Sequence, residues 1–255
     1  MIEVIKNKNL NNIVPTKCSV DDTSNLAYKV KAPLPKKSFA MYVCGRPGSG
    51  KTTTWLGLLT NKPTKRNPNM SRYYYRYFSH IWLISCSLQT LPLDKLNLNE
   101  DRIFNSFNDG MLIDIIEQER EDENLNNLII LDDCIKDLNN SNSKELSKLL
   151  LNRRHCSQNP DKEGQSGLSV LINSQVYNLL PCNLRKNMSH LIIFRTENKK
   201  ELQSIMTEVM ADLDEKTAKS VLNIAWEDDY SFLFIDATKM TKDRYYKNFD
   251  KIKIY

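Results

Sequence analysis

A short glycine-rich segment of the sequence has the residue types and spacing of a phosphate-binding loop. It matches the pattern G-x-x-x-x-G-K-[ST] at its four fixed positions, Gly45, Gly50, Lys51 and Thr52. In such a loop, glycines let backbone N–H groups point at phosphate oxygens, the lysine adds a charge beside the β- and γ-phosphates, and the hydroxyl suits Mg²⁺. The segment therefore predicts a site for a nucleoside triphosphate. Its predicted binding residues are Gly45, Arg46, Pro47, Gly48, Ser49, Gly50, Lys51, Thr52 and Thr53.

The residues on either side of this loop have the patterns of a strand and a helix. The loop is preceded by SFAMYVC, an apolar run typical of a buried strand, and followed by KTTTWLGLLT, which opens as a helix. The N-terminus of a helix favours anions. A surface turn that matched the pattern by accident would not need such flanks, so we favour the phosphate-binding interpretation.

Two adjacent aspartates close another apolar run, LIILDD. Asp132 is placed to enter the shell of a Mg²⁺ ion, directly or through a water, together with Thr52. Asp133 is placed to act as a general base on the attacking water. The alternative is a turn with two solvated aspartates. The position of the pair after a phosphate loop, with the strand candidate HIWLISCS between them, favours the metal-and-base interpretation.

A glutamine and three arginines complete the candidate site. Gln175 ends the apolar run LSVLINSQ, where its amide can sense the γ-phosphate or orient water, although many polar residues merely terminate a strand. Arg153, Arg154 and Arg185 are either solvated at helix ends, which the helix dipole favours, or supply a charge to the nucleotide of a neighbouring subunit.

The 255 residues suit one α/β domain of ordinary composition, with 40% hydrophobic and 26% charged residues. Alternating strand and helix patterns predict a mostly parallel central sheet flanked by helices on both faces. We expect an irregular lead-in over residues 1–38 with room for one edge strand, the core over residues 39–236, and a basic tail over residues 237–255.

Composition also argues against several other classes of site. The six cysteines are scattered without a C-x-x-C pair, which disfavours a disulfide framework or a zinc site. No apolar run approaches the roughly twenty residues of a membrane span, so we expect no membrane partner. The net charge of +5 alone says little about nucleic acid.

The order of these motifs resembles the FtsK–HerA superfamily of ring-shaped, DNA-translocating ATPases. The resemblance rests on GRPGSGKTT, LIILDDC, NRRH and LSVLINSQVYNLLPCNLRKNMSHLIIFRTENKKELQSI, and it extends from about Phe39 to Asp236. Within the superfamily the chain looks most like the genome-packaging ATPases of large cytoplasmic DNA viruses, the poxvirus-type branch. One departure is Asp133, where cellular members usually have glutamate.

This resemblance implies a RecA-like P-loop NTPase domain of the ASCE type that hydrolyses ATP with Mg²⁺. It implies that Gln175 is the sensor at the end of its strand. It also implies that Arg153 or Arg154 is an arginine finger acting on the next subunit, with Arg185 as a rival.

The partners that the resemblance implies are double-stranded DNA, a homo-oligomeric ring of five or six copies, and a capsid or portal-vertex protein. The expected location is the host cytoplasm, in the viral factory, with association with the virion. Alternatives are a cellular or plasmid DNA-pumping ATPase of the same superfamily, a nucleotide-dependent assembly switch without motor activity, and a small-molecule kinase.

Two segments combine basic residues with tyrosines, as DNA-contacting surfaces do. They are KPTKRNPNMSRYYYRYF, which includes Tyr73 to Tyr75, and KMTKDRYYKNFDKIKIY. Their charges would pair with phosphates and exposed rings would stack on bases. A solvated loop and a solvated tail are the alternatives, and the polar residues 157–167 are a further candidate for a DNA-contacting loop.

Overall fold

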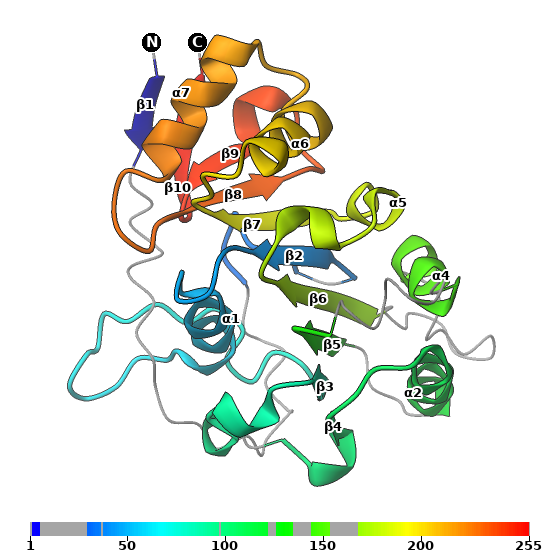
Figure 1. Cartoon of the computed structure of the whole chain (residues 1–255). Coiled ribbons are helices and arrows are strands. Elements are labelled where there is room, and N and C mark those ends of the chain that lie inside the picture. The colour runs from blue at the N-terminus through cyan, green and yellow to red at the C-terminus, as the bar shows by residue number, and fades with distance from the viewer. Residues whose placement is uncertain are drawn as a thin grey trace.

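The computed structural model describes residues 2–5, 30–36, 38–96, 98–121, 126–134, 144–153 and 168–254, and one mixed sheet runs through this part of the chain (Figure 1). Over those residues the sheet has ten strands in the order β1-β10-β9-β8-β7-β2-β6-β5-β3-β4. The strands are β1 (Ile2–Ile5), β2 (Ala40–Cys44), β3 (His80–Ser85), β4 (Ile103–Phe104), β5 (Asn127–Asp132), β6 (Leu168–Ser174), β7 (His190–Phe194), β8 (Phe232–Asp236), β9 (Tyr245–Lys247) and β10 (Asp250–Ile254).

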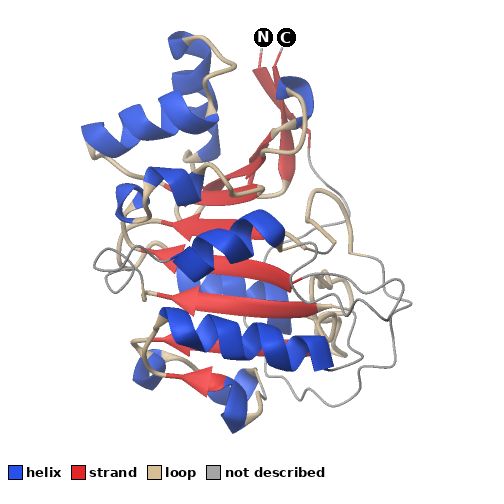
Figure 2. Ribbon diagram, turned by 90° about the vertical axis from the view of Figure 1, so that its right-hand side faces the viewer, coloured by secondary structure: helices blue, strands red, loops and turns tan. Residues whose placement is uncertain are grey.

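The central strands are parallel, which gathers their carboxyl ends at one edge of the sheet. β2 lies between β6 and β7 and is parallel to both, and β5 continues the parallel array beyond β6. In this register Cys44 lies opposite Ser174, and Asp132 lies opposite Asn173. Figure 2 shows these arrows side by side. The residues that follow β2, β5 and β6 therefore meet at the edge where parallel α/β sheets bind ligands.

The other end of the sheet is antiparallel and corrects one prediction. We expected a basic tail after Asp236, but β9 and β10 continue the sheet from β8. In β10, buried Ile252 alternates with Lys251 and Lys253, so the outward lysines give a half-buried strand the composition of a solvated tail. The predicted edge strand near the N-terminus is confirmed as β1, which pairs with β10.

Helices cover both faces of the sheet, as predicted. The helices are α1 (Lys51–Thr60), α2 (Asp109–Glu121), α4 (Lys144–Asn152), α5 (Cys182–Arg185), α6 (Lys199–Val209) and α7 (Glu215–Ala225). Short 3-10 turns are η1 (Leu88–Thr90), η2 (Leu93–Lys95), η3 (Glu100–Arg102), η4 (Tyr177–Leu179) and η5 (Thr241–Asp243). Figure 1 shows α1 on one face and α2 and α4 on the other.

The apolar residues of these helices explain which way they face. Leu146, Leu149 and Leu150 of α4 recur at helical spacing, and all three are buried in the core that α2 and α7 share. Trp55 and Leu58 of α1 belong to the core on the opposite face. No helix in the described part of the chain combines the length and apolar character needed to cross a membrane.

Candidate nucleotide-binding site

The phosphate-binding pattern lies between the end of β2 and the start of α1, as predicted. Gly50 has a φ of 99°, a left-handed conformation that residues with a side chain rarely adopt. A Cβ on Gly45 would lie 2.6 Å from the Cβ of Phe194, so the close approach to β7 requires glycine there. The two positions explain why the loop needs glycine, and the turn exposes the N-terminus of α1 to an anion.

Lys51 is the first residue of α1, and its side chain folds back over the loop. Its Nζ donates to the carbonyl oxygen of Arg46 at 3.2 Å, and the residue is only 7% exposed. Burial lowers the pKa of Lys51, and the nearby charges of Asp133 and Asp132 oppose that shift. A buried ammonium group with one hydrogen-bond acceptor among the described residues is well suited to gain phosphate oxygens as partners.

Asp132 ends β5 and is held by side chains from the strands on either side. Its carboxylate accepts hydrogen bonds from Ser85 Oγ of β3 at 3.0 Å and from Asn173 Nδ2 of β6 at 2.5 Å. Burial raises its pKa, and these two hydrogen bonds oppose the rise. The predicted metal-binding aspartate is therefore fixed in orientation, by two residues that we did not single out from the sequence.

The oxygen atoms here fit Mg²⁺. Asn173 Oδ1 is buried beside Asp132 and has no hydrogen-bond partner among the described residues. Thr52, the predicted second ligand, is the second residue of α1, across the site from Asp132. In the described part of the chain no group of three or more His, Cys, Asp or Glu side chains could hold a metal. Mg²⁺ would therefore share its shell with waters and phosphate oxygens, as it usually does.

Asp133 and Gln175 meet just beyond the strand ends. Asp133 follows β5 with a φ of 53°, and its backbone N–H donates to the carbonyl oxygen of Asn173 at 3.2 Å. Gln175 follows β6, and its Nε2 donates to Asp133 Oδ2 at 3.2 Å. The backbone of Ser174 also accepts from the N–H of Gly45 at 3.2 Å. The parallel register thus joins the glutamine to the phosphate loop and to the second aspartate.

Arg153 lies at the other edge of the sheet, away from the phosphate loop of its own chain. Its Nε donates to the carbonyl oxygen of Ser38 at 2.8 Å, and Ser38 precedes the first residue of β2. His190, the first residue of β7, is also near Arg153. Burial lowers the pKa of His190 to about 4; the charge of Arg153 adds to this shift and that of Asp236 opposes it. β2 has five residues and therefore spans about 16 Å between the Ser38 end, where Arg153 lies, and the phosphate loop. Arg153 therefore does not belong to the site in its own chain. Arg154 lies outside the described residues.

Arg185 has an intramolecular role that argues against its use as a finger. Its Nε and Nη2 donate to the two carboxylate oxygens of Glu208 at 2.8 and 2.6 Å, and it is 7% exposed. The guanidinium also lies 4.9 Å from the ring centre of Tyr177. Such a bidentate pair joins α5 to α6, and a guanidinium held this way is not available to another subunit.

No protein-family model and no curated protein matches this sequence. Solved structures do match the fold. The DNA-packaging ATPase B204 of Sulfolobus turreted icosahedral virus matches with a TM-score of 0.56 and 15% identity, covering 86% of this chain and 98% of that one. The genome-packaging NTPase B204 of Sulfolobus turreted icosahedral virus 2, in complex with AMPPCP, matches with a TM-score of 0.54 and 14% identity, over 87% and 99%. The chain has the fold of these B204 genome-packaging ATPases.

A second kind of protein shares this packaging-ATPase fold. The pCW3 conjugation coupling protein TcpA, as a monomer with ATPγS, matches with a TM-score of 0.51 and 12% identity, over 85% of this chain and 61% of that one. The predicted fold class, an α/β P-loop domain with a mostly parallel sheet flanked by helices, is confirmed.

The tyrosine-rich segment after α1 corrects another prediction, that its rings are exposed to stack on DNA bases. Tyr73, Tyr74 and Tyr75 are 1%, 3% and 6% exposed, so they do not offer rings to DNA bases. Tyr73 and Tyr74 belong to the core on the α1 face, where their large rings bury more apolar area than a surface position would. Lys65 and Arg66 are exposed in the same segment, so its charges are still presented to solvent.

Proposed function

We propose that this protein is an ATP-hydrolysing motor that moves double-stranded DNA, and that its task is to package a viral genome into a capsid. The observation that carries the proposal is the meeting of Lys51, the Asp132–Asp133 pair and Gln175 at three neighbouring strand ends. A phosphate loop, a buried acid, a second acid and a strand-end amide are the parts that ATP hydrolysis needs. The packaging-ATPase fold supports DNA as the cargo.

Each side chain has a separate task in the proposed reaction. Lys51 and the loop N–H groups bind the phosphates. Thr52 and Asp132 would hold Mg²⁺, which would supply positive charge to neutralise the triphosphate. The oxygen of water bonds to the γ-phosphorus as the bond to the bridging oxygen breaks, giving ADP and phosphate. Asp133 accepts a proton from that water, and Gln175, which contacts Asp133, orients the water.

The two aspartates should therefore fail in different ways. Asp132→Ala should lose Mg²⁺-dependent ATP binding, because the buried metal-binding carboxylate is gone. Asp133→Asn should still bind ATP but hydrolyse it about 10²- to 10⁴-fold more slowly, the usual contribution of a general base. Titration with ATP and Mg²⁺ and steady-state turnover measure the two effects, with Asp101→Asn as an exposed control. If Asp133→Asn binds ATP as poorly as Asp132→Ala, this division of tasks is wrong.

We further propose that the motor works as a homo-oligomeric ring of five or six subunits, engaged with a capsid or portal-vertex protein. Its proposed location is the host cytoplasm, in the viral factory, and the virion. Arg153 lies at the opposite edge of the sheet from its own phosphate loop, which is compatible with arginines of this segment acting only on a neighbour. The poxvirus-type branch is the form that the sequence resemblance favours.

A second candidate function is a DNA pump of a cell or plasmid. The match to a conjugation coupling protein favours it, because that protein has the same fold. Both candidates are DNA motors, and they differ in the structure into which the DNA passes. A nucleotide-dependent assembly switch and a small-molecule kinase remain the alternatives outside this class.

The ATPase rate with and without duplex DNA tests the proposal. A translocase should hydrolyse ATP several-fold faster with duplex DNA, and the stimulation should fall as salt rises, because phosphate contacts release counterions. Equal, slow turnover in both conditions would indicate a switch. Turnover that needs a small phosphate acceptor would indicate a kinase. Packaging is then tested by DNA uptake into capsids purified from the same source.

A further inference from the structure

A pocket of about 810 Å³ opens beside the phosphate loop, on the side away from Asp132 and Asp133. One wall is the start of α1, including Lys51 and Thr53, and the other is the loop between α7 and β8, residues 228–231. The turn between β9 and β10 and the ring of Tyr73 close it. We call this the nucleoside pocket. Its volume lies within the range of pockets that hold small ligands.

The strand order places this pocket opposite the hydrolytic groups. β6 and β5, which supply Gln175 and the aspartates, lie on one side of β2, while β7 and β8 lie on the other. The γ-phosphate must lie toward the hydrolytic groups. A triphosphate that crosses the phosphate loop therefore sends its base and ribose toward β8, where the nucleoside pocket opens.

The most prominent side chain of the pocket is an exposed aromatic ring. Tyr230 is 73% exposed, and a Cβ on Gly50 would lie 3.5 Å from its Cδ1, so the ring lies next to the phosphate loop. Its φ of 61° is in the left-handed region, which is unfavourable for a residue with a side chain. An exposed aromatic held in such a conformation beside a ligand site suggests a binding role.

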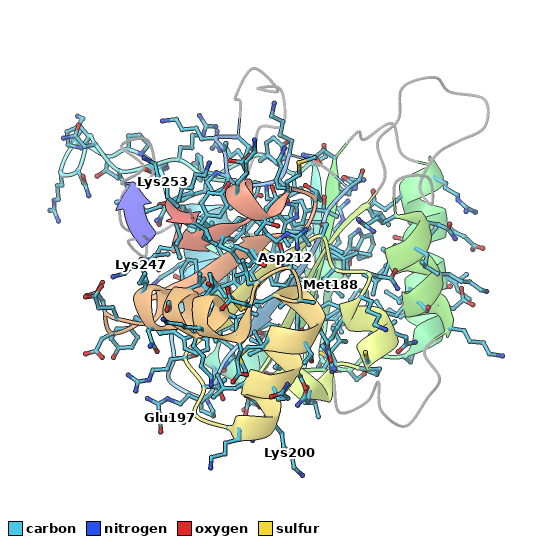
Figure 3. All side chains as sticks on the ribbon, turned by 90° about the horizontal axis from the view of Figure 1, so that it is seen from above. Met188, Glu197, Lys200, Asp212, Lys247 and Lys253 are labelled. Carbon is cyan, nitrogen blue, oxygen red and sulfur yellow. The ribbon has the colours of Figure 1, made fainter. Side chains whose placement is uncertain are left out.

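The loop that carries Tyr230 is tightly fixed. Ser231 donates to the carbonyl oxygen of Asp228 from its backbone N–H at 3.2 Å and from its Oγ at 2.7 Å. Lys247 of β9, labelled in Figure 3, bridges Glu227 at 2.9 Å and Asp228 at 2.6 Å. Below the loop, the rings of Phe232 and Phe249 pack with their centres 5.4 Å apart. These contacts hold the backbone that carries Tyr230.

The charges on the wall of the pocket opposite Lys51 suit a nucleoside and not a phosphate. Asp228 and Asp229 line that wall; Asp228 is paired with Lys247, and the carboxylate of Asp229 repels the phosphates that Lys51 attracts. Carboxylates can accept hydrogen bonds from ribose hydroxyls or from an amino group of a base. This distribution of charge favours one direction for the nucleotide across the loop.

We propose that the nucleoside pocket binds the base and ribose of a purine nucleoside triphosphate, with Tyr230 stacked on the base. The inference rests on the proposed function, since it completes the ATP site of the motor. It also gives the C-terminal hairpin β9–β10 a part in nucleotide binding through Phe249 and through the Lys247 bridge.

The test removes the ring and relieves the unfavourable backbone in one change. Tyr230→Gly should weaken binding of the slowly hydrolysed ATPγS by about tenfold or more, the scale of one base–aromatic stack. Inorganic tripolyphosphate, which has no base, should bind to Tyr230→Gly with the same affinity as to the wild type. Tyr230→Phe keeps the ring and should bind ATPγS almost normally. The wild type should also prefer ATP to CTP, and Tyr230→Gly should reduce that preference. Calorimetric titration measures all of these affinities.

The controls separate stacking from folding. Thermal unfolding of Tyr230→Gly should show equal or higher stability, because glycine tolerates the left-handed conformation. Met240→Ala, which removes another highly exposed side chain that does not line the pocket, should leave ATPγS binding unchanged.

Three outcomes would overturn the inference. The first is an ATPγS affinity of Tyr230→Gly equal to that of the wild type. In that case the proposed function would still stand if Lys51→Ala abolished ATPγS binding. An equal loss of ATPγS and tripolyphosphate binding would show that the ring supports the loop and not the base. A wild-type protein that binds neither ligand would overturn both the nucleoside pocket and the proposed function.

Discussion

Replacing Lys51 by alanine is expected to abolish ATP hydrolysis while the fold stays intact. The ammonium group is buried beside the loop, and it is the side-chain charge that the phosphate-binding pattern directs at the β- and γ-phosphates. Removing one preorganised charge that meets the transition state typically lowers turnover by about 10²- to 10³-fold or more. Lys51 also contributes to binding, so the affinity for ATP should fall as well. Steady-state turnover and nucleotide titration measure the two losses.

The fold should tolerate this change because the only hydrogen bond described for the Lys51 side chain goes to a loop carbonyl. Burial already lowers its pKa, so removing the charge relieves a desolvation penalty. The matched control is Lys216→Ala, an exposed lysine on α7 that should leave turnover unchanged. Turnover within a few-fold of wild type in a folded Lys51→Ala protein would remove the phosphate-loop interpretation.

The second large effect is expected from the arginines that follow α4. A finger that acts on the nucleotide of the next subunit should, when removed, lower turnover by about 10³-fold or more with little effect on ATP affinity. The side chain of Arg153 donates to backbone carbonyl oxygens of Ser38 and Leu150, so we expect Arg154 to be the finger. Arg154→Ala should then show the larger loss, and Arg153→Ala a smaller one caused by weaker anchoring of α4.

Mixing two inactive variants tests whether the arginine acts between subunits. An Arg154→Ala subunit keeps its own phosphate loop, and a Lys51→Ala subunit keeps its own arginine. In a mixed ring some interfaces would join an intact loop to an intact arginine, so partial ATPase activity should return. Arg153→Ala is mixed in parallel, and recovery with it instead would transfer the role to Arg153.

The result that contradicts the trans-acting finger is equally clear. If Arg154→Ala is inactive and shows no recovery in rings proven to be mixed, Arg154 acts within its own subunit; the same result for Arg153→Ala would indicate a structural role, because Arg153 anchors α4. Arg185 is not expected to inherit the role, because its buried pair with Glu208 gives any loss at that position a structural cause. Arg185→Ala should lower the thermal stability together with activity.

The sequence by itself determined the phosphate loop, the acid pair and the strand-end glutamine, since each depends on local chain order. A strand, a glycine turn and a helix are consecutive, so Lys51 must face the loop. Asp132 and Gln175 were found because each ends an apolar run, and parallel strands bring such ends to one edge. The same rule applied to every polar residue at or just before a strand end would have found Ser85 of β3 and Asn173 of β6.

Only the tertiary structure decided the features that join distant segments. The nucleoside pocket combines the start of α1 with the loop before β8 and the hairpin β9–β10, which are separated by more of the chain than any local pattern spans. Pairing with β9 and β1 makes a lysine-rich segment into β10, and burial under α1 removes Tyr73 from the surface. Arg185 shows the same limit, because its partner Glu208 lies two elements further on. Burial and pairing of this kind depend on which segments the sheet order makes neighbours, and residue type alone does not encode that order.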